Sequence, residues 1–110
     1  MAVKANIVIE QGTSFETSVN VLDDNDVAVN LTGYTGAAQM RKHYSSSNAH
    51  SFTVSITAST GLVSLSMNAN TTGNIAAGRY VYDCELTKTS EGTVSRVIEG
   101  IATVTPQVTR

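Results

Sequence analysis

Short β-strands separated by turn residues account for nearly all of the chain, from Ala5 to Val104. Within each stretch apolar and polar residues alternate, as expected of strands with one buried face. The stretch Ser14 to Leu22, for example, places Phe15, Val19 and Val21 on one face and polar residues on the other. The other side chains predicted to face inward are Thr17, Ile7, Ile9, Ala38, Met40, Phe52, Val54, Ile56, Val63, Leu65, Met67, Tyr80, Tyr82, Cys84, Leu86, Val94, Ile98, Ala102 and Val104.

Turn signals between these strands predict two hairpins and one helical crossover. The turn Ala58 to Gly61 joins the first hairpin, and Lys88 to Gly92 joins the second, with Gly supplying a positive φ. Gly100, inside the last strand, indicates a bulge or bend. Asn70 to Ala77 is the best candidate for a helix, with an Asn or Thr cap before Gly78 ends it.

About seven strands, two hairpins and one short helical crossover predict an all-β protein, an antiparallel immunoglobulin-like β-sandwich. A small barrel is the alternative. Residues 1–110 are expected to form a single domain with short extended N- and C-terminal tails. The order of strand pairing does not follow from the pattern, because several sandwiches fit the same series of strands.

Composition excludes several classes of function. Hydrophobic residues make up 41% of the chain and charged residues 15%, with a net charge of −2. Nucleic-acid binding needs clustered Lys and Arg, which this chain lacks, and no apolar run approaches the length that spans a membrane. The single cysteine, Cys84, forms no internal disulfide, which suits synthesis in a reducing cytoplasm.

Two clusters resemble metal sites but are better explained as surface loops. His43 and His50 are seven residues apart across a serine-rich loop with no carboxylate between them, so exposed histidines are favoured over a metal or acid–base pair. The acidic cluster Asp23, Asp24 and Asp26 lacks the spacing of a calcium loop, so a solvated hairpin turn is favoured.

The sequence shows no set of catalytic residues. Cys84 alternates with apolar residues and is predicted to be buried, and no Gly-x-Ser-x-Gly nucleophile motif is present. Asp83 and Glu85 are predicted to be exposed charges that pair with Arg79 or Arg96 across the second hairpin. We therefore expect no enzymatic activity, no cofactor, no metal and no small-molecule ligand.

Arg41, Lys42 and Tyr44, together with His43, form the one basic and aromatic segment. It is either an exposed strand end or a contact surface for an acidic partner, since Arg and aromatic residues are enriched in interfaces. Val3 and Val108, in the two tails, complete the predicted interface residues.

Three motifs occur in order: Val29-Asn30-Leu31-Thr32-Gly33-Tyr34-Thr35, Gly61-Leu62-Val63, and Ala77-Gly78-Arg79-Tyr80-Val81-Tyr82-Asp83. With the closing segment Val97 to Pro106, this order resembles the immunoglobulin-like domain of tailed-bacteriophage structural proteins, notably the N-terminal domain of baseplate upper proteins. The resemblance covers about Ile9 to Val104. The chain ends at Arg110 without the receptor-binding or coiled-coil extension of that family, which suggests a free-standing adaptor or decorating subunit.

The resemblance implies a virion structural protein present in many copies, assembled in the bacterial cytoplasm, with other virion proteins as partners. A tail or baseplate adaptor is the first expectation and a capsid decoration protein the alternative. The tails Met1 to Asn6 and Pro106 to Arg110 are expected to dock on neighbours by strand addition. A carbohydrate- or cell-surface-binding module, with Tyr34 and Tyr44 as sugar platforms, is the second alternative.

Overall fold

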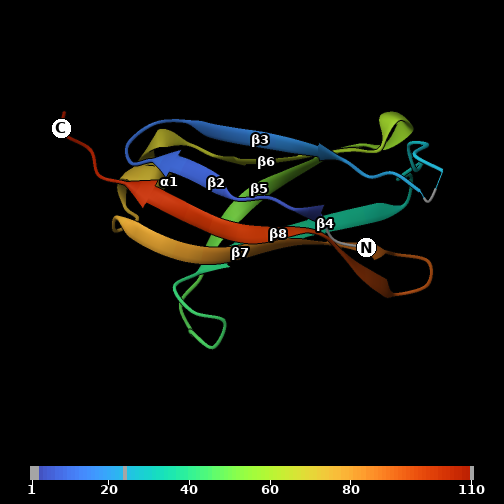
Figure 1. The fold of residues 1–110 in the computed structure, drawn as a ribbon. Coiled ribbons are helices and arrows are strands. Elements are labelled where there is room, and N and C mark those ends of the chain that lie inside the picture. Colours follow the sequence, from blue (N-terminus) through green and yellow to red (C-terminus); the bar gives the residue numbers. More distant parts are fainter. Residues whose placement is uncertain (1–2, 24, 110) are drawn as a thin grey trace.

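The computed structural model describes residues 3–23 and 25–109 and shows a mostly β protein with one short helix (Figure 1). The strands are β1 (Val3–Lys4), β2 (Ile7–Glu10), β3 (Phe15–Asn20), β4 (Tyr34–Arg41), β5 (His50–Thr57), β6 (Leu62–Met67), β7 (Gly78–Lys88) and β8 (Thr93–Thr105). The helix is α1 (Ala69–Gly73), and a single 3₁₀ turn, η1, covers Ala58–Thr60.

All eight strands belong to one hydrogen-bonded sheet. Its order is β1-β8-β7-β4-β5-β6-β3, and β2 also pairs with β8. β5 holds the two halves together, because His50 and Phe52 pair with β4 while Thr53 to Thr57 pair with β6. The sheet therefore curls into a half-barrel around its apolar face, with β5 running obliquely between the two halves (Figure 1).

The prediction of an all-antiparallel sheet is wrong at the N-terminus. β1 and β2 both run parallel to β8, with Val3 opposite Ile98 and Ile7 opposite Ala102. The predicted first strand, which starts at Ile7, is β2, and β1 is an additional strand in the predicted N-terminal tail, so the described residues form eight strands rather than seven. The alternation of side chains identifies a strand but does not show whether it runs parallel or antiparallel to its neighbour. The sequence therefore predicted β2 as a strand but not the direction of its pairing.

Both predicted hairpins are confirmed. β5 pairs antiparallel with β6 across η1 and Gly61, whose φ is 66°. A Cβ at Gly61 would lie 2.7 Å from the carbonyl oxygen of Val29, so glycine is required for space as well as for conformation. β7 and β8 form the second hairpin, which is the longest pairing in the sheet.

The irregularity predicted at Gly100 lies elsewhere. The register of β7 and β8 shifts between Cys84, opposite Ile98, and Glu85, opposite Arg96, so Val97 is the extra residue of a bulge. Because of the bulge, the side chain of Val97 is buried, with 6% of its surface exposed. Val94, which was predicted to face inward, instead faces outward and is 55% exposed. Gly100 instead marks a close approach, because a Cβ there would overlap the carbonyl oxygen of Ala5.

The N-terminal segment runs beside β8 past Gly100 and is fixed there by three hydrogen bonds. The amide of Ala5 donates to the carbonyl of Glu99 at 2.9 Å, and the carbonyl of Ala5 accepts from the Tyr82 hydroxyl at 2.5 Å. The side-chain oxygen of Asn6 accepts from the amide of Ile101 at 3.1 Å. Residues 3–6, predicted to be a free docking tail, are thus occupied within the chain's own sheet.

The helix is shorter than predicted and begins earlier. Asn68 caps it by accepting from the amide of Thr71 at 2.8 Å, and the helix ends at Gly73 rather than Ala77. Thr72 is fully buried, donates to the carbonyl of Thr13 at 2.7 Å and accepts from the amide of Gly12 at 3.1 Å. The helix therefore joins β6 to β7 and also fixes the turn between β2 and β3.

The core lies inside the curl and follows the predicted faces. Its most completely buried side chains come from β2, β4, β6, β7 and β8 and from two connecting segments. They are Ile9, Leu31, Met40, Val63, Leu65, Ile75, Cys84, Leu86, Ala102 and Val104. Phe52 contacts Phe15 and Tyr82, each at 6.1 Å between ring centroids, so its ring connects the two halves of the sheet.

Replacing Gly100 by Ala should destabilise the protein by about 1–3 kcal/mol, the usual cost of overpacking, because the N-terminal segment must move away from β8. Chemical denaturation measures this change. Gly73→Ala is the matched control, since a Cβ there meets only the Cα of Gly12, at 3.7 Å. Equal stability of the two variants would contradict the close approach.

Candidate functional surfaces

The predicted basic segment begins at the end of β4 and continues into the loop before β5. Arg41 is half-buried, and its guanidinium donates to the carbonyl of Ser46 at 2.5 Å and to the side-chain oxygen of Gln39 at 3.0 Å. The Ser46 hydroxyl accepts from the amide of His43 at 3.1 Å. Arg41 therefore shapes the loop, and its charge is only partly available to a partner.

A hollow of about 450 Å³ opens between this loop and the segment that precedes β7. Its lining residues are Lys42, Ser46, Ser47, Asn48, His50, Ala76 and Tyr80. The ammonium of Lys42 lies 5.0 Å from the centre of the Tyr80 ring, and the His50 ring meets Tyr80 edge-on at 5.9 Å. The hydroxyls of Ser46 and Ser47, the amide of Asn48 and the ammonium of Lys42 suit a small polyol or an anion.

The two histidines are separated by the structure. His50 lines the hollow, whereas His43 is exposed in the loop. Within residues 3–23 and 25–109, no group of three or more His, Cys, Asp or Glu is arranged to hold a metal ion. Every buried side-chain nitrogen or oxygen in this part of the chain has a hydrogen-bond partner.

Tyr44 is 85% exposed and lies beside the outer face of β8, β7 and β4. It borders one shallow hollow with Arg41 and Asp83 and a second with Lys4 and Ile101. Tyr44 and Arg41 therefore share a surface, as predicted from their proximity in the sequence. Tyr34, the other predicted sugar platform, is instead half-buried among apolar residues.

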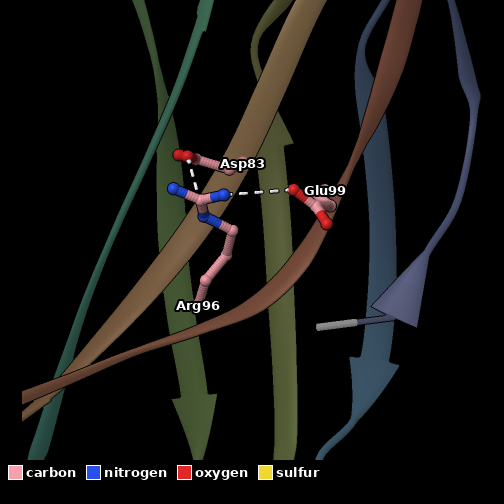
Figure 2. A network of polar contacts seen from close by, with 3 residues as sticks. All are labelled: Asp83, Arg96 and Glu99. Atoms are coloured by element: carbon pink, nitrogen blue, oxygen red, sulfur yellow. Dashed lines mark hydrogen bonds and ion pairs between the residues drawn. The ribbon is translucent and has the colours of Figure 1, made fainter. Parts of the chain in front are cut away.

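A small network of charges lies on the same outer face (Figure 2). Arg96 bonds to Asp83 at 3.3 Å across the β7–β8 hairpin and to Glu99 at 3.2 Å along β8. The prediction that Asp83 pairs with Arg96 is confirmed. Because these side chains are partly exposed, each ion pair contributes at most about 1 kcal/mol to stability.

The acidic cluster before β4 forms a tight turn, as predicted. One carboxylate oxygen of Asp23 accepts from the amides of Asn25 and Val27 at 2.8 and 3.0 Å, and Asp26 has a φ of 61°. Leu22 and Ala28 pair across this turn. Asp24 lies outside the described residues.

Val3 and Val108 line neither of the two hollows that Tyr44 borders, and they lie apart from each other. Val3 is beside Ile98, whereas Val108 follows the other end of β8 and is 92% exposed. The five predicted interface residues therefore form no single surface: Arg41 and Tyr44 are neighbours, Lys42 faces the hollow, and the two valines lie elsewhere.

A groove that the sequence analysis missed lies between the two edges of the curled sheet, where β1 faces the end of β3. We call it the seam groove. It has a volume of about 230 Å³ and is lined by Val3, Asn20, Val21, Leu22, Asp23, Asp26 and Val97. In the sequence, this groove is indicated only by the last strand, which has apolar residues on both of its faces near Val97.

Cys84 is fully buried, and this burial raises the pKa of its thiol to about 11, with a smaller contribution from the charges of Asp83 and Glu85. The thiol is thus protonated at neutral pH and a poor nucleophile. Burial also raises the pKa of the Tyr82 hydroxyl. Both groups face the core and serve packing, as predicted for Cys84.

The described part of the chain contains no helix long and apolar enough to cross a membrane. Neither a search against models of known protein families nor a search of curated proteins finds a match to this chain.

Cys84 should make the protein less stable in mild alkali. Below about pH 8 the thiol is protonated in both folded and unfolded chains, but above its unfolded pKa of about 8.5 only the unfolded chain releases the proton. Stability therefore falls as pH rises towards the folded pKa. Between pH 8 and 9.5 the free energy of unfolding should drop about 1 kcal/mol more in the native chain than in Cys84→Ala. Parallel pH profiles would contradict the shifted pKa.

Proposed function

We propose that this chain is a non-enzymatic structural subunit of a bacteriophage virion, with a tail or baseplate adaptor as the first assignment. The supporting observation is the ordered set of phage-like motifs, each at a position where the fold needs those residues. Leu31 is 2% exposed, and Gly33, with a φ of 85°, then turns the chain into β4. Gly61 and Gly78 also have positive φ, at the starts of β6 and β7.

The tyrosine motif supports the same assignment. Tyr80 and Tyr82 both point into the core, and their hydroxyls donate to the carbonyls of Ala76 and Ala5. These bonds fix the helical crossover and the N-terminal segment against β7. The two tyrosines of the motif therefore stabilise the fold, and a structural role for this motif is what the resemblance to phage proteins implies.

We further propose that the curled sheet is a variant of the immunoglobulin-like sandwich. One layer would comprise β1, β2, β8, β7 and β4, and the other β6 and β3, with β5 contributing to both. In this variant, β5 stays hydrogen-bonded to both β4 and β6, and it therefore joins the two packed layers into one curled sheet.

The surface suits association with neighbouring virion proteins. β3 is paired only with β6, and β2 only with β8, so two strand edges of the described sheet offer backbone groups for pairing. The exposed positions of β5 are all Ser or Thr, and those of β3 are Glu16, Ser18 and Asn20, so these surfaces are polar and carry little charge. A capsid decoration protein would use the same features and is the alternative location.

Mass spectrometry of purified virions, separated into heads and tails, tests the proposal. The phage that encodes this chain should carry it at a few copies per particle in the tail fraction. Hundreds of copies in the head fraction would support the decoration protein instead. Absence from both fractions would contradict a virion role.

The hollow beside Tyr80 favours a second candidate, a module that binds carbohydrate or a cell surface. Its hydroxyls and the Asn48 amide are groups that bind sugars. On a glycan array, Asn48→Ala should then reduce binding at least tenfold, and Tyr44→Ala, outside this hollow, should leave it unchanged. No glycan bound by the native chain would eliminate this candidate.

A further inference from the structure

The hollow beside Tyr80 belongs to a part of the chain that carries no negative side chain. All nine Asp and Glu residues lie within residues 10–26 and 83–99, so the stretch 27–82 contains none. Every described residue that lines the hollow comes from this stretch. The described walls of the hollow are thus free of carboxylates, although the whole chain has a net charge of −2.

The positive charge on these walls comes from Lys42. Its ammonium lies 5.0 Å from the centre of the Tyr80 ring, which attracts it and so holds it beside the hollow. A Cβ at Gly78 would lie 2.6 Å from the same nitrogen, so the missing side chain there leaves room for the ammonium. Within residues 3–23 and 25–109 the ion pairs involve Lys88 and Arg96, and Lys42 forms none.

Hydrogen-bond donors accompany this charge. Ser47 and Asn48 line the hollow from the β4–β5 loop, which projects from the sheet in Figure 1, and both side chains are exposed. The guanidinium of Arg41 bonds to the carbonyl of Ser46 and places a second positive charge at this loop. A cation and nearby N–H and O–H donors are the groups that bind carboxylate and phosphate oxygens most strongly.

The aromatic ring in the hollow is not a stacking platform for a neutral sugar. Tyr80 is only 6% exposed, and the Lys42 ammonium lies over its ring. The other ring that lines the hollow, that of His50, meets Tyr80 edge-on. Charge and hydrogen bonding, rather than ring stacking, therefore determine what this hollow binds.

We propose that the hollow beside Tyr80 binds a saccharide unit that carries an oxyanion, either a carboxylate or a phosphate. The ammonium of Lys42 attracts the oxyanion, and Ser47 and Asn48 donate hydrogen bonds to its oxygens. The volume of about 450 Å³ lies within the usual range of ligand pockets, roughly 300–1,000 Å³, and leaves room for the sugar ring. The inference rests on the second candidate function, whose ligand class it names, and is independent of the virion assignment.

Titration of the isotope-labelled full chain with glucuronate and with glucose, at constant ionic strength, tests the role of the charge. Glucuronate should shift the amide resonances of Ser46, Ser47 and Asn48 in a saturable way. Glucose has the same ring without the carboxylate and should leave them unchanged. Equal binding of both sugars would overturn the oxyanion while leaving a neutral carbohydrate module in place.

A second pair of ligands separates a charged sugar from a free ion. Glucose 6-phosphate should bind more tightly than inorganic phosphate and shift the same loop amides. Inorganic phosphate that binds as tightly as the sugar phosphate would overturn the saccharide. No shift with any of these ligands would overturn the inference, and the glycan array would still test neutral glycans separately.

Two substitutions of exposed side chains test the assigned groups. Lys42→Gln removes the charge, and Asn48→Asp places a carboxylate on the wall in nearly the same shape, so each should weaken glucuronate binding at least tenfold. Lys88→Gln is the control for net charge, because Lys88 lies at the other end of β7 and pairs with Glu91 at 3.1 Å. Native affinity in Lys42→Gln, or an equal loss in Lys88→Gln, would contradict the assigned site.

Discussion

β5 is hydrogen-bonded to both halves of the sheet, and this shared pairing determines how the sheet curls. Its first residues bond to β4 and its last to β6, so the two halves of the sheet cannot separate into independent layers. The resulting curl encloses one apolar core, in which Phe52 contacts rings from both halves. The same curl brings the two outer edges of the sheet, β3 and β1, to either side of the seam groove.

The N-terminal segment illustrates how local packing sets what the surface offers. Because Gly100 has no side chain, Ala5 can approach β8 and accept the Tyr82 hydroxyl, and Val3 then forms one wall of the groove. The bulge at Val97 supplies its floor. The groove thus arises from a glycine and a bulge in one strand.

Side-chain alternation predicted what lies inside the protein but not how the strands meet. Tyr80, Tyr82 and Cys84 are buried as their spacing indicated, because a two-residue period depends only on the strand itself. The parallel pairing of β1 and β2 with β8 depends on contacts between residues about 95 positions apart, which no local pattern encodes. The seam groove escaped prediction for the same reason: Val3, Leu22 and Val97 come from three distant segments.

We propose that this chain functions by association through the edges of its sheet. Hydrogen exchange of the protein in intact virions, compared with the dilute purified protein, tests it most directly. We expect slower exchange in the particle for the amides of the edge strands β2 and β3, since neighbours would cover them. Equal exchange at these positions, with protection only around the hollow at Lys42 and His50, would contradict association through the sheet edges.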